Sequence, residues 1–222
     1  MQQRIQTFKP RRGRYSSQQR AALERATHLL TLDALPARED IFEGKPFIIE
    51  IGFGMGDATL VQAARHPDIG ILAIDVHTPG VGRLLAELEE RGITNVRVIE
   101  GDALELIHDR LPTASALGIR VYFPDPWPKA RHHKRRIITQ SNLDAMARCL
   151  VPQGFLHFAT DWAPYALAAQ DEIAAHRQFR LLESDEHPEL AKASERPRTK
   201  FEDRGIAAGR SITDLVAITV QS

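Results

Sequence analysis

FIIEIGFGMGD, residues 47–57, is the segment that decides the fold of this chain. An apolar run ends in a turn with a glycine at every second position, Gly52, Gly54 and Gly56, and a helical pattern follows. Glycine lets the backbone bend sharply and lie close to a ligand. The segment therefore predicts a buried strand that leads through a ligand-binding turn into a helix.

The glycine spacing differs from that of a dinucleotide-binding turn, which reads G-x-G-x-x-G. Gly56 comes one place too early, and Asp57 holds the position that the dinucleotide pattern needs. Glu50 precedes Gly52 by two residues, and its negative charge suits a cationic group better than a pyrophosphate. A nicotinamide dehydrogenase is therefore disfavoured, and a turn without any ligand is the remaining alternative.

Acidic residues stand at the ends of the next two predicted strands. The apolar run 69–75 ends in Asp75, which comes 19 residues after Gly56, a position from which an acid can bond a ribose hydroxyl. Residues 96–100 lead into Asp102, which could accept from an adenine amino group. Each acid alone could be a helix N-cap. Three acids at three successive strand ends favour a ligand site at the carboxyl edge of an open sheet.

A second segment, GIRVYFPDPWPKARHHKRR at residues 118–136, joins an apolar strand to a cationic run. Asp125 lies between two prolines, which fix their own φ and push the preceding residue toward extended geometry. Trp127 and the basic residues follow at once. A carboxylate, an aromatic face and a cationic cluster so close together suggest chemistry on a base of a polyanion. The alternative is a stiff surface loop with solvated charges.

The basic residues are concentrated in two places. Residues 1–20 hold six and residues 129–136 hold five of the 29 lysines and arginines, and neither stretch contains an acid. The rest of the chain has 18 basic against 29 acidic residues, although the formal net charge is zero. Two cationic islands on an acidic body predict a polyanionic partner, because Arg and Lys contacts to phosphate supply most non-specific nucleic-acid affinity.

Length and composition predict one domain, residues 18–222, preceded by a basic arm, residues 1–17. No apolar run approaches the ~20 residues that a membrane span needs, and no signal peptide is evident, so we expect a cytoplasmic protein with no membrane contact. The single cysteine, Cys149, is expected to be a core thiol. No zinc-type spacing of His and Cys is present, so no metal is expected, and no obligatory protein partner is evident.

Periodicity predicts alternating strands and helices. We expect seven strands, at 47–52, 70–75, 96–100, 118–124, 155–159, 178–183 and 212–220, and helices that include 18–35, 57–66, 103–110, 140–150 and 164–175. Residues 185–210 are expected to be irregular. This order predicts an α/β fold with a mostly parallel seven-stranded sheet, helices on both faces and a late antiparallel strand.

Two later segments add polar groups. Residues 158–162, FATDW, place Asp161 and Trp162 at the end of a fifth strand, although Asp161 could be only a helix cap. Residues 196–205, RPRTKFEDRG, mix hydroxyl, ammonium, aromatic and carboxylate groups that could read a base edge and hold a phosphate.

Taken together, these segments resemble the tRNA (guanine-N7-)-methyltransferase family in its bacterial single-chain form. The glycine turn resembles motif I of the class I S-adenosylmethionine-dependent methyltransferases. Asp75 is a departure, because the family more often has Glu there, and residues 207–211 match loosely and receive no role. The matching strings span almost the whole chain in order: QTF (6–8) to GR (13–14), EIGFGMG (50–56), DVHTPGVG (75–82), FPDPWPK (123–129), ATDW (159–162) and RTKFE (198–202).

This resemblance implies a Rossmann-like class I methyltransferase fold, S-adenosylmethionine as cofactor, tRNA as partner, and methylation of a guanine N7 in the tRNA variable loop. It implies that Asp125 is the catalytic-site acid. It further implies cofactor-binding roles for Glu50, Gly52, Gly54, Gly56, Asp75, Asp102 and Asp125, and substrate-binding roles for Lys129, Asp161, Thr199, Lys200, Phe201 and Glu202.

Guanine N7 has a free lone pair and no proton to lose, so the reaction needs no obligatory general base. A fixed carboxylate at Asp125 would favour the positive charge that the ring gains, and could also accept from the guanine N1 and amino edge. Trp127 or Trp162 could stack a base, unless either packs in the core. A methyltransferase that acts on another RNA base, or on a small molecule, and a non-catalytic RNA-binding module are the alternatives.

Overall fold

The computed structural model describes residues 5–8, 16–25, 28–35, 41–183, 197, 200–207 and 209–220. Its strands form a single eight-stranded sheet in the order β1-β4-β3-β2-β5-β6-β8-β7. The strands are β1 (Leu29–Leu30), β2 (Phe47–Ile51), β3 (Gly70–Asp75), β4 (Val96–Glu100), β5 (Ala116–Tyr122), β6 (Leu150–Thr160), β7 (Phe179–Leu181) and β8 (Thr213–Thr219).

Every neighbouring pair from β1 to β6 is parallel, and β8 pairs antiparallel with both β6 and β7. This arrangement confirms the predicted α/β fold with its late antiparallel strand. Since the chain continues from β2 to β3 on one side and β5 lies on the other side, the strand order reverses beside β2. Ligands of open α/β sheets bind at such a reversal, outside the carboxyl ends of the strands.

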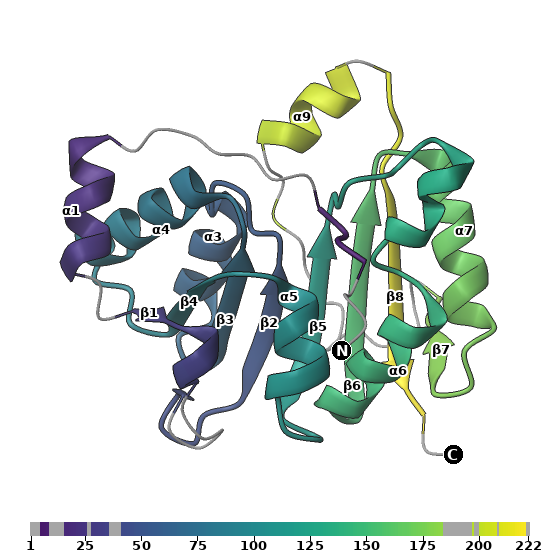
Figure 1. The fold of residues 1–222 in the computed structure, drawn as a ribbon, viewed down its shortest axis with the longest axis horizontal. Helices are drawn as coiled ribbons and strands as arrows, with labels where there is room; N and C mark the ends of the chain where they lie inside the picture. Colours follow the sequence, from purple (N-terminus) through teal and green to yellow (C-terminus); the bar gives the residue numbers. More distant parts are fainter. Residues whose placement is uncertain are drawn as a thin grey trace.

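The described helical elements are α1 (Ser17–Arg25), η1 (Leu32–Ala34), α3 (Asp57–Arg65), α4 (Thr78–Arg91), α5 (Ala103–Glu105), η2 (Leu106–Arg110), η3 (Ala130–Arg135), α6 (Gln140–Cys149), α7 (Ala163–Ala174) and α9 (Lys200–Ala207). In Figure 1, α1, α3 and α4 gather at the β3–β4 side of the sheet, α6 and α7 lie toward β6 and β8, and α9 stands above the upper edge.

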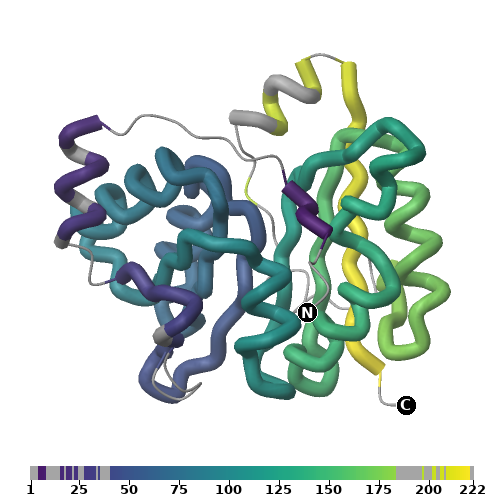
Figure 2. Tube along the Cα trace, viewed as in Figure 1, coloured from purple at the N-terminus to yellow at the C-terminus, as the bar shows by residue number. Residues whose placement is uncertain are grey.

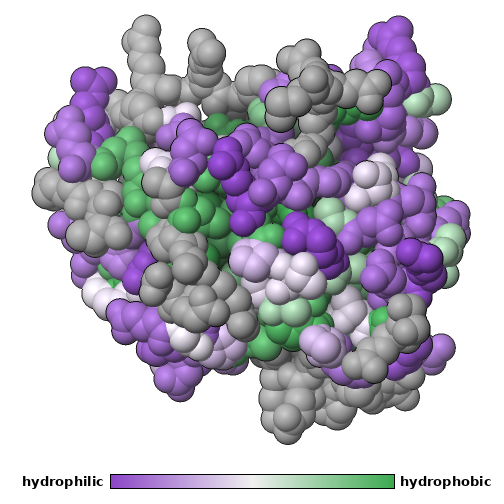
Figure 3. Space-filling view, turned by 60° about the horizontal axis from the view of Figure 1, so that its bottom comes forward, coloured by the Kyte–Doolittle hydropathy of each residue, from purple (hydrophilic) through white to green (hydrophobic). Residues whose placement is uncertain are grey.

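Both faces of the sheet are covered, because alternate residues of the central strands belong to different apolar clusters. Ile71 and Ala73 of β3 pack with α3 and α4, whereas Leu72 and Ile74 pack in the larger cluster that includes α6 and α7. Strand β2 is therefore buried along its whole length. Figure 3 shows hydrophobic residues toward the middle of the face that it turns forward and hydrophilic residues along both lateral margins.

The seven-strand prediction was wrong by one strand, at the expected helix 18–35. Helix α1 ends at Arg25, and Leu29 and Leu30 pair with Val98 and Ile99 of β4 instead. Without β1, the edge of β4 would leave backbone N–H and C=O groups unpaired. Hydrogen bonding to these groups favours an extended conformation for Leu29 and Leu30 more strongly than their helical sequence pattern favours a helix. The expectation that residues 185–210 are irregular was also wrong for residues 200–207, which form α9.

Several other bounds differ locally from the prediction. The expected helix 103–110 is one turn of α-helix that continues as the wider π-type turn of η2. Strand β6 already begins at Leu150. Cys149 is a buried free thiol, as expected, and burial raises its pKa. None of the described helices is long and apolar enough to cross a membrane.

The first described residues, 5–8, lie far from α1 along the sheet. The Cα trace in Figure 2 places the short described segment 5–8 over the β5–β6 part of the sheet, whereas α1 lies beyond α4 at the other side. Trp127 and Arg135 bind the backbone of residues 6–8, which fixes that placement.

Candidate functional site

The glycine turn follows β2 at the carboxyl edge of the sheet. Gly52, Gly54 and Gly56 all have positive φ, at 75°, 60° and 80°. A Cβ on Gly52 or Gly54 would meet no atom of the described residues within 4 Å, so this part of the turn faces open space. Gly80 in α4 comes so close that its own Cβ would lie 1.8 Å from the Gly54 carbonyl oxygen. The turn is therefore built against the start of α4 and left open on its other side.

Asp75 fixes this turn from the end of β3. Its Oδ2 accepts from the Gly54 N–H at 2.7 Å, and its Oδ1 accepts from the His77 N–H at 2.8 Å. Burial raises the pKa of the Asp75 carboxyl, and these backbone donors oppose the rise. A carboxylate has about four acceptor sites, so two such bonds leave capacity for a ligand hydroxyl.

Arg83 of α4 holds the outer side of the turn. Its guanidinium donates to the Met55 carbonyl oxygen and, at 2.8 Å, to Asp57 Oδ1. No sequence pattern predicted this role, because a residue in a regular helical stripe carries no signal for a contact with a distant turn.

Glu50 lies in β2 directly before the glycine turn and is only 3% exposed. Its Oε2 and the Thr59 hydroxyl are buried without a completed hydrogen bond among the described residues. Burial raises the Glu50 pKa, and the charge of Arg120 counteracts that rise, with a smaller contribution from the Thr59 hydroxyl. One oxygen of this carboxylate, Oε2, is thus left to accept a hydrogen bond from a ligand.

Asp102 follows β4 at the same edge of the sheet. Its side chain caps α5, because Oδ1 accepts from the Leu104 N–H at 2.9 Å. The N-cap alternative therefore holds for this residue.

Asp125 lies on a tightly held loop after β5. Phe123 and Trp127, two residues before and after it, have φ values of 50° and 46°, the left-handed region that bulky residues rarely adopt. Such strain persists only where surrounding contacts enforce it, and it gathers at functional sites. The prolines indicated a rigid turn, but no local pattern predicted these two flanking conformations.

Trp127 makes some of the contacts that hold this loop in its strained conformation. Its side chain is 4% exposed, and its Nε1 donates to the Thr7 carbonyl oxygen at 2.9 Å. The Arg135 guanidinium lies 3.8 Å from the centre of its ring, and the His132 ring meets it edge-on. The face of Trp127 is therefore occupied, so of the two tryptophans only Trp162, 37% exposed after β6, is open to a base.

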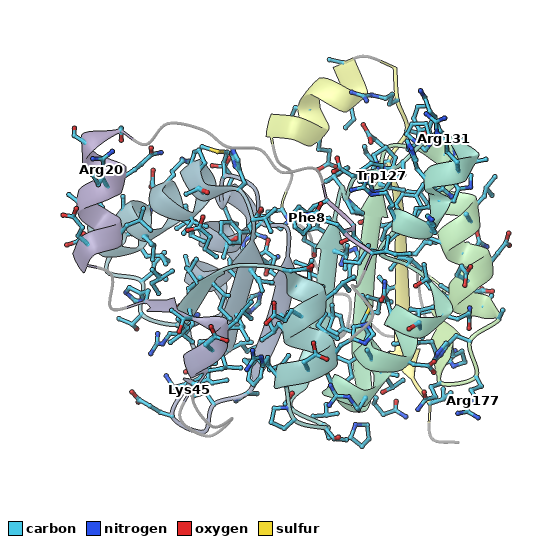
Figure 4. All side chains as sticks on the ribbon, in the orientation of Figure 1. Phe8, Arg20, Lys45, Trp127, Arg131 and Arg177 are labelled. Atoms are coloured by element: carbon cyan, nitrogen blue, oxygen red, sulfur yellow. The ribbon has the colours of Figure 1, made fainter. Side chains whose placement is uncertain are left out.

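The cationic run divides into bracing and exposed residues. Arg135 donates to the carbonyl oxygens of Gln6 and Phe8 at 2.8 and 3.2 Å, and Arg136 donates to that of Pro126 at 3.1 Å. The cations that remain exposed are Lys129, Arg131 and Lys134. In Figure 4, Trp127 and Arg131 lie at the upper end of the sheet and Phe8 beside its upper part, with Lys45 and Arg177 at the opposite end.

The remaining predicted substrate residues are described in part. Asp161 follows β6 and forms an ion pair with Arg210 at 2.9 Å, which ties it to the segment before β8. Glu202 is a buried residue of α9. Lys200 and Phe201 belong to the same helix, and nothing further is described for their side chains; Thr199 lies outside the described residues. Helix α9 stands above the carboxyl edge, so part of the RTKFE string lies over the candidate site (Figure 1).

Comparison with known proteins adds to this geometry. Residues 44–215 match a protein-family model described as "Putative methyltransferase". A tRNA (guanine-N(7)-)-methyltransferase of Streptomyces avermitilis is 45% identical over 224 residues, which cover 99% of this chain and 77% of that protein. A protein of the same name from Alkalilimnicola ehrlichii is 43% identical over 95% of this chain and 91% of its own length.

Among solved structures, a ribosomal RNA (adenine-N(1))-methyltransferase from Catenulisporales acidiphilia, determined with its cosubstrate S-adenosylmethionine, superposes with a TM-score of 0.53. The match is 17% identical in sequence and covers 79% of this chain and 86% of the other, which shows a shared fold. With the family match and the near full-length identities to the two relatives, the chain belongs to the tRNA (guanine-N(7)-)-methyltransferase family.

Proposed function

We propose that this protein transfers a methyl group from S-adenosylmethionine to N7 of a guanine in the variable loop of tRNA, and that it does so in the cytoplasm. The relatives named above are tRNA (guanine-N(7)-)-methyltransferases, which supports tRNA and guanine N7 as the targets. The observation that carries the proposal is that two features lie at the same edge of the sheet: the acids around the glycine turn and the cation-rich Asp125 loop.

The residues around the glycine turn fit S-adenosylmethionine. Because Gly52 and Gly54 have no side chain and face open space, the cofactor could lie close to the protein backbone there. The Glu50 carboxylate, with its unsatisfied Oε2, would attract the cationic amino group of the methionine part of the cofactor. Asp75 retains acceptor capacity for a ribose hydroxyl, and Asp102, which follows β4 at the same edge, would accept from the adenine amino group. When bound, the cofactor supplies a methyl group that a positive sulfonium makes electrophilic.

Asp125 is the group that we assign to the guanine. Its loop is held by Trp127 and Arg136, so the carboxylate is set in place before substrate arrives. It would accept from the N1 and amino edge of guanine and favour the positive charge that the ring gains at N7. Correct approach of N7 is the main requirement, because the nucleophile carries no proton, and a preset loop supplies that orientation.

The tRNA would be held by exposed cations rather than by the whole cationic run. Lys129, Arg131 and Lys134 are exposed near Asp125 and can reach phosphates, whereas Arg135 and Arg136 are committed to backbone carbonyls. The basic arm would add contacts to the tRNA, because its residues 6–8 are bound to the Asp125 loop through Arg135. Helix α9 above this edge of the sheet, and Asp161 after β6, would add further contacts to the tRNA.

The test is methyl transfer from labelled S-adenosylmethionine to bulk tRNA, followed by location of the product. We expect one labelled 7-methylguanosine in the variable loop, found by mass spectrometry of nuclease fragments and by chain cleavage at 7-methylguanosine. Label on another base would favour the alternative of a different RNA methyltransferase. Absence of label from tRNA, with S-adenosylmethionine bound, would refute the tRNA assignment.

A further inference from the structure

Two oppositely charged side chains are buried next to each other in the sheet, close to the glycine turn of the proposed cofactor site. Glu50 of β2 and Arg120 of β5 are partners in the parallel register, so their side chains leave the sheet on the same face. The two side chains are 3% and 1% exposed, and Arg120 is the largest fully buried side chain among the described residues. An arginine at this depth is unusual, because Arg is almost never fully buried unless it is paired.

The surroundings of Arg120 are mostly apolar. It borders a small cavity under α3, together with Ile48, Ile69, Ile71, Gln62 and His66. A charge in such a place is costly to bury, and it persists when an opposite charge and hydrogen bonds compensate for the lost water. The charge of Arg120 lowers the Glu50 pKa and so offsets part of the burial effect, which is the larger of the two and leaves that pKa raised.

Other titratable groups near Glu50 do not replace Arg120. Asp75 approaches from β3 and, being acidic, raises the Glu50 pKa further. Helix α3 presents the uncharged Thr59 and Gln62, and its C-cap residue His66 borders the cavity beside Arg120. Arg83 of α4 is engaged by Asp57 and Glu87. His157, the next partner of Arg120 in the register, is bound to Tyr122 and Asp214.

We propose that Arg120 is a positioning residue that keeps the Glu50 carboxylate charged and turned toward the amino group of bound S-adenosylmethionine. The inference rests on the proposed cofactor site and adds a residue that lies 70 positions away in the chain and outside the glycine turn. Arg120 itself does not touch the cofactor in this scheme. Without it, Glu50 takes up a proton at a higher pH and loses its attraction for the cationic group.

The test measures binding of S-adenosylhomocysteine by calorimetry at pH 5.5 to 8.5, without tRNA, in the wild type and in Arg120→Met, Arg120→Lys, Glu50→Gln and the Glu50→Gln/Arg120→Met double variant. We expect Arg120→Met to weaken binding about tenfold at neutral pH and to shift the pH midpoint of binding upward by about one unit or more, as expected when a carboxylate loses a neighbouring cation. Arg120→Lys should restore most of the affinity. In the Glu50→Gln background, Arg120→Met should have little further effect.

A ligand control separates the amino group from the rest of the cofactor. Methylthioadenosine keeps the adenosine and the sulfur but has no amino acid part, so its affinity should hardly change in Arg120→Met. An unchanged pH profile for S-adenosylhomocysteine, or an equal loss of affinity in the Glu50→Gln background, would overturn the proposal. So would an equal loss for methylthioadenosine.

Folding is checked by thermal melting of each variant. If Arg120→Met alone fails to fold and the double variant folds, the pair is coupled as proposed, because only the single variant leaves a buried charge unpaired. If both fail, Arg120 serves the fold independently of Glu50 and the proposal is wrong. If the wild type itself binds no S-adenosylhomocysteine, the proposed function fails, and melting of the same variants still reports whether the two residues are coupled.

Discussion

The Oδ2 atom of Asp75 accepts a hydrogen bond from the backbone N–H of Gly54 at 2.7 Å, so the acid at the end of one strand fixes the turn at the end of its neighbour. The sequence predicted Asp75 as a ribose ligand; the structure adds a contact that shapes the turn. An aspartate is one methylene shorter than the glutamate more typical of the family, and its carboxylate lies against the turn itself. Asp75 therefore links the geometry of the glycine turn to any ribose contact.

Replacing Asp75 should accordingly affect both stability and cofactor affinity. Asp75→Ala leaves the Gly54 and His77 N–H groups without their acceptor, and each such loss costs about 1–3 kcal/mol when the donor is buried. We expect a lower melting temperature without ligand and a large loss of S-adenosylhomocysteine affinity. Asp75→Asn keeps one acceptor oxygen, so its melting temperature and its affinity should lie between those of the wild type and those of Asp75→Ala. Normal melting of Asp75→Ala with reduced affinity would instead indicate a ribose contact alone.

Two different substitutions of Asp102 should separate its capping of α5 from its proposed contact with adenine. Asp102→Ala removes the N-cap of α5, which costs about 0.5–2 kcal/mol, together with any adenine contact. Asp102→Ser keeps a capping oxygen but shortens the side chain. We expect near-normal melting and weakened S-adenosylmethionine binding for Asp102→Ser, measured by calorimetric titration. Unchanged affinity in both variants would contradict the assignment of Asp102 to the adenine.

The sequence predicted those parts of the site that depend on strand ends. Glu50, Asp75 and Asp102 each end or follow an apolar run, and a parallel sheet brings such ends to one edge, so local pattern plus topology was sufficient. Trp127 was different. Its local sequence allows either stacking or packing, and only the contact with Thr7, 120 residues away, decides for packing.

The errors in the predicted fold also come from contacts between residues that are distant in the sequence. The leucines at 29 and 30 have a helical pattern, but they pair with β4, whose edge is distant in sequence. The seven-strand prediction failed there because backbone pairing with a distant strand cannot be read from periodicity. Arg120 was also missed, because a single basic residue within an apolar strand does not identify its partner in the neighbouring strand.

Trp162 should be the tryptophan that contributes to substrate binding. Trp162→Ala should weaken tRNA binding by about 1–3 kcal/mol if a base stacks on it, with little change in melting temperature, because the side chain is exposed. Leu167→Ala is the matched control, since Leu167 is an exposed apolar residue of α7. Trp127→Phe should lower the melting temperature through loss of the Thr7 hydrogen bond. Equal tRNA affinity in Trp162→Ala and the wild type would remove the stacking role.

The basic arm should bind phosphates of the tRNA. Arg11, Arg12 and Arg14 lie outside the described residues, between a segment docked on the Asp125 loop and α1. Neutralising them to Gln should weaken tRNA binding and lower the slope of log affinity against log salt by about one for each phosphate that the arm no longer neutralises. Lys45→Gln and Arg177→Gln, at the opposite end of the sheet in Figure 4, are controls for net charge. An unchanged slope in the arm variant would mean that the arm binds no phosphate.

Asp125 should matter for the rate of methyl transfer far more than for cofactor affinity. Asp75 holds the glycine turn and Glu50 lies beside Arg120, so Asp125→Ala should bind S-adenosylhomocysteine almost normally. Removing one preset electrostatic interaction costs about 10²–10³ in rate, which we expect for Asp125→Ala in single-turnover transfer to tRNA at saturating cofactor.

Asp125→Asn then distinguishes charge from position. The amide can still accept one hydrogen bond from the guanine edge but carries no negative charge to balance the charged ring. If the rate depends on charge, Asn should be nearly as slow as Ala; if it depends on position, Asn should retain most of the wild-type rate. A normal rate in both variants, with melting confirming the fold, would mean that Asp125 takes no part in the reaction. The strained conformations of Phe123 and Trp127 would then serve only to anchor segment 5–8 of the basic arm.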